Sequence, residues 1–132
     1  MPKRTADKDS FAQFLARHGL PEPRCSSGVG PGWIPLLDEL VTKLKAAGWT
    51  GGFAQIKEKL GGLRAYPEGL LPPEQRKIIW DAEARSMTIC EQCGQPGALL
   101  TNKHWLMTRC PACAPEGAEP YKQDDSDEDE SP

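Results

Sequence analysis

Four cysteines near the C-terminal end constrain the fold more than any other feature of the chain. They form two pairs, Cys90/Cys93 and Cys110/Cys113, in the arrangement C-x2-C-x16-C-x2-C. Two cysteines separated by two residues can direct both sulfurs at one ion, and two such pairs complete a tetrahedron of thiolates around Zn²⁺. Four thiolates leave no open coordination position, so the pattern predicts structural rather than catalytic zinc.

Other uses of these cysteines are less consistent with the sequence. The N-terminal residues are polar and do not form a secretory signal, so we expect a cytoplasmic protein whose thiols stay reduced rather than forming disulfides. A thioredoxin-like redox site would need one pair within a βαβ pattern, which is not found here. Spacing alone leaves an iron–sulfur cluster open. The role of the fifth cysteine, Cys25, in a loop rich in Gly and Ser, is also left open.

The segment between the cysteine pairs predicts a small zinc-ribbon hairpin. Leu99–Thr101 and Trp105–Thr108 read as two short strands with a turn at Asn102-Lys103. Gly94 follows the first pair, where the chain needs a residue that tolerates positive φ. The loop of residues 94–109 is too short for a core of its own, so metal binding should supply much of the folding free energy of this small unit.

The remaining sequence predicts one small α+β domain of about three helices and a β-hairpin, coupled to the ribbon. Helices are expected over 11–18, 33–47 and 74–87, and the third runs almost directly into Cys90. No window approaches the roughly 18 apolar residues of a membrane span. We divide the chain into an N-terminal segment with a short amphipathic helix (1–24), an α+β body (25–89), the zinc ribbon (90–113) and a disordered acidic tail (114–132).

Charge is distributed unevenly along the 132 residues. Residues 116–132 hold eight acidic residues against one lysine, whereas residues 1–115 hold fifteen Lys and Arg against eleven Asp and Glu. The tail therefore sets the low pI, and the folded part is mildly basic. Charge runs of this kind are usually solvated extensions that aid solubility.

A hairpin is predicted between the second and third helices, where Gly61-Gly62 separates two apolar residues. Pairing of Leu60 with Leu63 and of Lys59 with Arg64 would place Ile56, Leu60, Leu63 and Ala65 on one face, and Gln55, Lys57, Lys59, Arg64 and Tyr66 on the other. Like charges opposite each other destabilise a hairpin, which indicates an anion-binding surface. Two alternatives remain: the bases are simply solvated, or residues 54–60 form a helix and the basic face does not exist.

Glu58 would point to the apolar face of this hairpin. A carboxylate there requires a cation, and Arg85 on the third helix is the expected partner in a structural ion pair.

Several motifs together resemble a family of small uncharacterised proteins encoded by tailed phages and prophages. They are Gly32-Trp33 before an apolar helix, Lys57-Glu58-Lys59-Leu60-Gly61-Gly62-Leu63-Arg64 followed by Tyr66, Ala82-Glu83-Ala84-Arg85-Ser86, and Cys90-x-x-Cys93-Gly94. The resemblance covers residues 25–113. It implies a setting in the bacterial cytoplasm and an accessory or host-takeover role, without a biochemical activity that can be transferred.

Two functions follow from these features. In the first, Lys57, Lys59, Arg64 and Tyr66 bind nucleic acid, with phosphate contacts and stacking on the ring. In the second, the protein is an inhibitor or adaptor of a host or defence protein, and the acidic tail contributes charge. Catalysis is disfavoured, because His18 and His104 are the only histidines and neither accompanies a plausible nucleophile.

Overall fold

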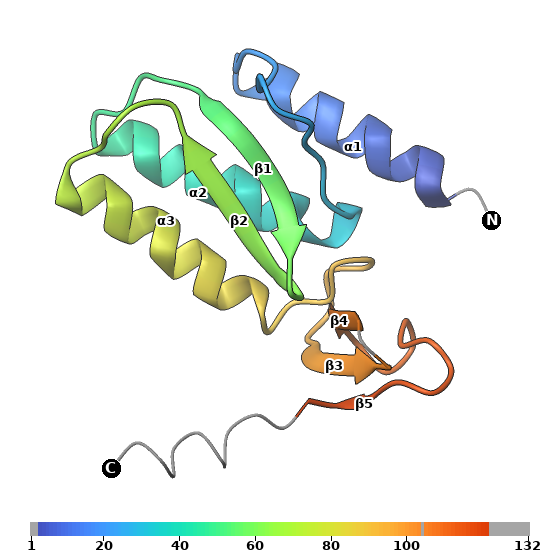
Figure 1. Ribbon diagram of the computed structural model, residues 1–132. Helices are drawn as coiled ribbons and strands as arrows, with labels where there is room; N and C mark the ends of the chain where they lie inside the picture. Colours follow the sequence, from blue (N-terminus) through green and yellow to red (C-terminus); the bar gives the residue numbers. More distant parts are fainter. Residues whose placement is uncertain (1–2, 104, 122–132) are drawn as a thin grey trace, which may run out of the picture.

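Three helices and two small antiparallel sheets form the fold, which confirms the α+β class (Figure 1). The computed structural model describes residues 3–103 and 105–121, with side chains from residue 10 onward. The elements are α1 (Lys3–Arg17), the 3₁₀ turn η1 (Pro31–Trp33), α2 (Ile34–Ala46), β1 (Phe53–Lys59), β2 (Gly62–Pro67), α3 (Pro73–Ser86), β3 (Ala98–Asn102), β4 (Trp105–Arg109) and β5 (Glu119–Pro120). Within the described part of the chain, no helix is both long and apolar enough to cross a membrane.

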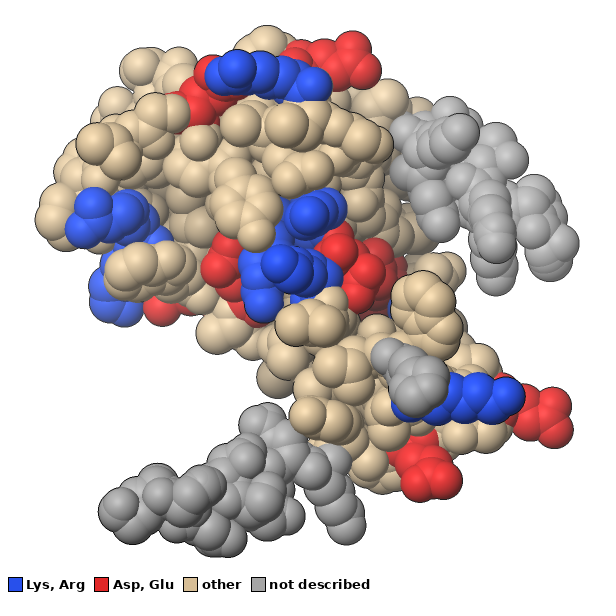
Figure 2. Space-filling model, in the orientation of Figure 1, with Lys and Arg blue, Asp and Glu red and all other residues tan. Residues whose placement is uncertain are grey.

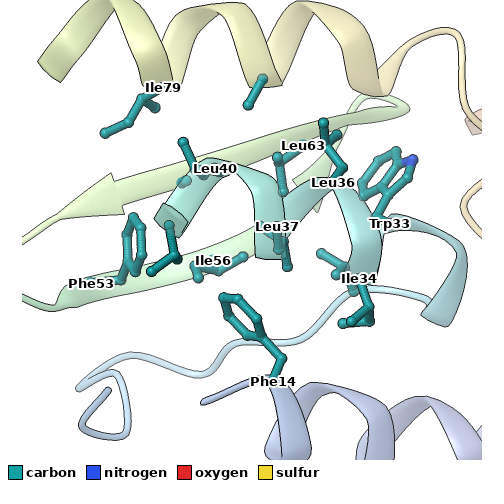
Figure 3. Packing of buried hydrophobic residues seen from close by; sticks show 14 of the residues in the cluster. Phe14, Trp33, Ile34, Leu36, Leu37, Leu40, Phe53, Ile56, Leu63 and Ile79 are labelled. Carbon is teal, nitrogen blue, oxygen red and sulfur yellow. The ribbon is translucent and has the colours of Figure 1, made fainter. Parts of the chain in front are cut away.

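The β1–β2 hairpin lies over α2, with α3 along the β2 side and α1 beyond the β1 side (Figure 1). The predicted helix over 33–47 is confirmed as η1 and α2, and the large apolar side chains of α2 are all buried. The core joins them to Phe14 of α1, to Ile79 of α3 and to the inner face of the hairpin (Figure 3). Burial of each large apolar side chain contributes about 1.5–3 kcal/mol, and the buried residues of this core all lie outside the ribbon.

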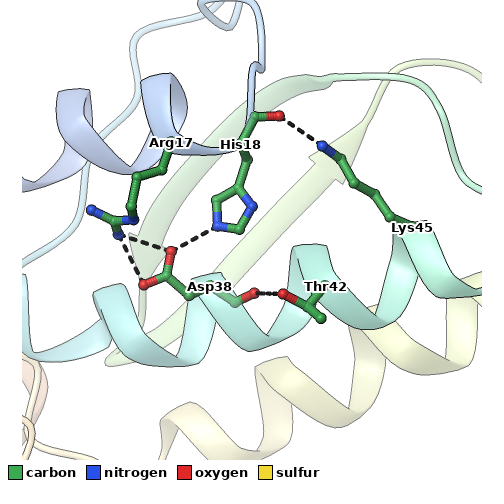
Figure 4. A network of polar contacts seen from close by, with 5 residues as sticks. All are labelled: Arg17, His18, Asp38, Thr42 and Lys45. Carbon is green, nitrogen blue, oxygen red and sulfur yellow. Dashed lines mark hydrogen bonds and ion pairs between the residues drawn. The ribbon is translucent and has the colours of Figure 1, made fainter.

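A polar network fastens the end of α1 to α2 (Figure 4). Arg17 donates two hydrogen bonds to the Asp38 carboxylate at 2.8 and 2.9 Å, and His18 Nε2 lies 2.8 Å from the same group. Lys45 donates to the His18 carbonyl at 2.7 Å. Gly19 has a φ of 64° and stops the helix as predicted, but α1 begins at Lys3 and is longer than the expected segment 11–18.

The hairpin exists as predicted, which rules out the helical alternative, but its predicted register is wrong. Lys59 pairs with Gly62 and Lys57 with Arg64, so the two-residue loop is Leu60-Gly61, with φ of 55° and 87°. The pairing moves by two positions, and because side chains alternate along a strand, each strand residue keeps its predicted face. Leu60 is the exception, since it belongs to the loop and is 61% exposed instead of buried.

Both edges of this two-stranded sheet are covered by other parts of the chain. Along β1, the Cys25 N–H donates to the Ala54 carbonyl at 3.0 Å and the Gly28 N–H donates to the Ile56 carbonyl at 2.8 Å. Along β2, the Leu63 and Ala65 N–H groups donate to Ser86 and Glu83 of α3 at 2.9 and 3.0 Å. A hairpin is marginal alone, so these contacts explain how two strands suffice.

The second sheet has the order β4-β3-β5 and contains the predicted ribbon hairpin. The prediction of a disordered tail from residue 114 is wrong for its first part: Glu119 pairs with Thr101, Pro120 pairs with Leu100, and the Tyr121 N–H donates to the Leu99 carbonyl at 3.1 Å. The acidic composition of this segment gave no indication of a strand. Residues 122–132, which carry most of the acidic run, and His104 lie outside the described residues.

Candidate metal centre and basic hairpin face

The four predicted zinc ligands come together in space. The Sγ atoms of Cys90, Cys93, Cys110 and Cys113 all lie within 4.8 Å of one another, and those of Cys93 and Cys110 are 3.5 Å apart. Tetrahedral zinc with Zn–S bonds of about 2.3 Å requires sulfurs about 3.8 Å apart, so the cluster has the donor set and spacing of a Zn²⁺ site. Cys25 is not part of it; its thiol is exposed, in the segment along β1.

Each cysteine pair forms a tight turn that directs its sulfurs inward. In the first, the Gly94 N–H donates to the Cys90 carbonyl at 2.9 Å, and Gly94 has the predicted positive φ, 85°. In the second, the N–H groups of Cys113 and Ala114 both donate to the Cys110 carbonyl, at 3.1 and 3.0 Å. Cys90 and Cys110 are buried, whereas Cys93 is exposed, so the metal would sit at the rim of the ribbon.

The electrostatics of the cluster also favour a cation. Burial opposes ionisation of Cys90, but backbone N–H groups of Cys93, Cys110 and Gln92 outweigh it and lower the pKa of Cys90 to about 6. Burial and then the neighbouring thiols raise the pKa of Cys113 to about 12. The Cys90 thiol therefore loses its proton readily and the Cys113 thiol keeps its proton, because negative charges this close repel each other. A divalent cation removes that conflict, and its binding would displace the thiol protons.

The first cysteine turn is held by the loop before α2. The Gly32 N–H donates to the Glu91 carbonyl at 2.7 Å, and the Trp33 indole N–H donates to the Ile89 carbonyl at 2.8 Å. A Cβ on Gly32 would lie 2.2 Å from the Cys90 carbonyl oxygen, so only glycine allows this approach. The Gly32-Trp33 motif therefore positions the first cysteine turn.

The tip of the β1–β2 hairpin rests on the ribbon. The hydroxyl of fully buried Thr108 donates to the Gly61 carbonyl at 2.7 Å. A Cβ on Gly61 would lie 2.5 Å from Cδ1 of Leu99, so the glycine allows close approach as well as the turn. The ribbon strands therefore support the loop that joins the two basic strands.

The predicted basic residues share the outer face of this hairpin. Lys57 lies opposite Arg64, Tyr66 lies opposite Gln55 and is 40% exposed, and Lys59 is exposed beside the loop. Among the described residues, neither Lys57 nor Lys59 has a hydrogen-bond or ion-pair partner, and Arg64 Nη1 donates only to the Leu63 carbonyl, at 3.2 Å. Lys and Arg side chains gather over the hairpin, with acidic side chains at their margins (Figure 2).

The expected ion pair between Glu58 and Arg85 is wrong. Arg85 instead lies 3.1 Å from Glu39 of α2, and Glu58 accepts the Gly61 N–H at 2.7 Å. The shifted turn explains the difference: Leu60-Gly61 leaves the Gly61 N–H without a ladder partner, and the Glu58 carboxylate, three residues earlier, reaches it.

Sequence reasoning missed a second group next to the basic face. Arg64 and Tyr66 line a groove together with Arg76, Trp80 and Glu83 of α3. Burial raises the pKa of Glu83, although its hydrogen bond from the Ala65 N–H and the charge of Arg64 act in the opposite direction. The signal was present, since spacings of four and three put these α3 residues on one helix face.

Comparison of the chain with protein-family models, with curated proteins and with solved structures gave no match. The cysteine cluster and the basic face are therefore the features that indicate what this protein does.

Proposed function

We propose that this protein is a zinc-ribbon module that binds nucleic acid through the outer face of the β1–β2 hairpin. The observation that carries the proposal is the convergence of Lys57, Lys59 and Arg64, none of them in an ion pair with a described residue, beside the exposed ring of Tyr66. A bacterial, phage-related setting, which the resemblance implies, forms part of the same proposal.

The contrast with the rest of the surface supports this choice of face. Most other described cations are paired with carboxylates, as in the ion pairs of Arg17, Arg24, Lys43, Lys77, Arg85 and Arg109. Leaving Lys57 opposite Arg64 costs free energy in the unbound protein. Phosphates would relieve that repulsion and release counterions, which drives binding to nucleic acid.

Zinc has a supporting role in this proposal. Zn²⁺ on the four cysteines would hold the ribbon against the hairpin tip and so fix Lys59, which is next to the loop. The adaptor alternative depends on the eight acidic residues within 116–132. Only two of them, Glu116 and Glu119, lie among the described residues, so this alternative stays a prediction.

The test is binding of a fluorescently labelled 20-nucleotide DNA across a range of salt concentrations. We expect affinity to fall steeply with salt, and the triple variant Lys57→Ala/Lys59→Ala/Arg64→Ala to reduce the slope of log K against log[salt] by about 2, at roughly 0.7–0.9 per lost phosphate contact.

The matched control is Lys43→Ala/Lys45→Ala/Lys77→Ala, which removes the same charge from exposed positions on α2 and α3. An equal loss in both triple variants would mean that net charge, and not this face, binds DNA. Absence of binding at low salt would overturn the proposal.

A further inference from the structure

A groove opens beside the basic face, between β2 and α3. It has a volume of about 320 Å³ and is lined by Arg64, Tyr66, Leu70, Arg76, Trp80 and Glu83, among others. Arg64 and Tyr66 belong both to this groove and to the basic hairpin face. A strand of nucleic acid with phosphates on Lys57 and Lys59 would therefore reach the groove without leaving the surface.

Two aromatic rings on this groove are left in solvent. Trp80 is 61% exposed and Tyr66 is 40% exposed, although the core has room for Trp33 and Trp49. The Arg76 guanidinium lies 6.0 Å from the Trp80 ring centroid and also donates to the Leu71 carbonyl at 3.1 Å, which restrains the indole and the cation together. Exposed rings next to cations are the elements of a stacking platform for bases.

The groove also contains a carboxylate that does not suit a phosphate. Glu83 Oε2 accepts the Ala65 N–H at 3.0 Å, and within the described residues Oε1 has no hydrogen-bond partner. A phosphate would be repelled by this group, whereas the amino edge of a base can donate to it. Its position therefore favours a base, and not a phosphate, next to Glu83 in the groove.

We infer that this groove is a base-binding site for single-stranded nucleic acid, in which an unstacked base lies against Trp80 and Tyr66 while the flanking phosphates meet Arg64, Arg76 and the hairpin lysines. The inference rests on the proposed function and specifies its ligand. Bases inside a duplex are paired and stacked, so a duplex could use only the phosphate contacts.

The experiment measures binding of the full chain to (dC)₁₂ and to a 12-base-pair duplex at the same salt concentration. We expect the single strand to bind about tenfold more tightly than the duplex, and Trp80→Ala to weaken single-strand binding about tenfold without changing duplex binding or the salt slope. Trp80→Phe keeps a stacking ring and should retain most of the affinity.

Trp105→Ala is the matched control, because Trp105 is 74% exposed but lies on β4 of the ribbon, outside the groove. Unchanged single-strand affinity in Trp80→Ala, or duplex binding as tight as single-strand binding, would overturn the base site and leave the proposed function standing. Absence of salt-dependent binding to either DNA, or tighter binding of poly-glutamate than of both, would overturn the two together.

Discussion

Thr108 shows how a single side chain connects the ribbon to the functional face. Its side chain is fully buried, and its hydroxyl gives the Gly61 carbonyl the hydrogen bond that the hairpin loop cannot supply. A buried carbonyl without a partner costs free energy, so this residue secures the hairpin tip as well as filling space.

Thr108→Val should therefore lower the free energy of unfolding by about 1–3 kcal/mol, since the shape is kept and the Gly61 carbonyl loses its donor. Urea denaturation of the zinc-loaded protein measures the change. Thr101→Val is the control, because the Thr101 hydroxyl makes only a long, exposed contact of 3.4 Å with Lys103 and should cost less than about 0.5 kcal/mol. Equal stability of the two variants would contradict a supporting role for the hydroxyl.

At the scale of elements, α3 has two roles that depend on the same residues. Its inner side closes the free edge of β2 through Glu83 and Ser86, and its outer side presents Trp80 to the groove. Glu83 belongs to both, because one carboxylate oxygen holds the strand while the other is available to a ligand. Glu83 therefore contributes both to closing the edge of the sheet and to the proposed base site.

Glu83→Gln should change the pH dependence of stability in a defined direction. Burial raises the pKa of Glu83 above 4.5, so the folded state holds this proton more tightly than the unfolded chain. The resulting stabilisation is present below pH 4.5 and is lost as pH rises through the folded-state pKa. The stability of the wild type relative to Glu83→Gln should therefore fall as pH rises above 4.5.

Urea midpoints measured for both proteins at each pH give this difference, in which any loss of metal that is common to both cancels. A difference that rises with pH for Glu83→Gln would contradict the assigned environment.

The elements differ in how far the sequence could predict them. Local patterns suffice for α2, with its apolar stripe before Gly48, and for the cysteine turns, whose spacing alone defines the ligand set. The hairpin register could not be predicted, because Gly61-Gly62 permits two loops, and the choice depends on contacts with Thr108 and Leu99 some 40 residues away. The groove was missed for the same reason: it joins two elements that no local pattern relates.

At the scale of the whole molecule, the body and the ribbon differ in how much the stability of each depends on the other. The apolar core consists of residues from α1, η1, α2, α3, the hairpin and the loops between them, whereas the ribbon has the cysteine cluster in place of a core. Metal loss should therefore unfold the ribbon, free the hairpin tip and leave the body folded. Binding of nucleic acid would weaken as a consequence, because Lys59 lies next to the released loop.

Metal removal tests this asymmetry. We expect one zinc per chain, retained in Cys25→Ser and lost under chelator competition in Cys93→Ser; both cysteines are exposed, but only Cys93 belongs to the cluster. In the metal-free wild type, hydrogen exchange should accelerate across β3 and β4 and at Gly61, while α2 stays protected and DNA affinity falls. Full protection of β3 and β4 without metal would show that the ribbon is stable on its own, and equal loss of protection in α2 would show that the body and ribbon fold as one unit.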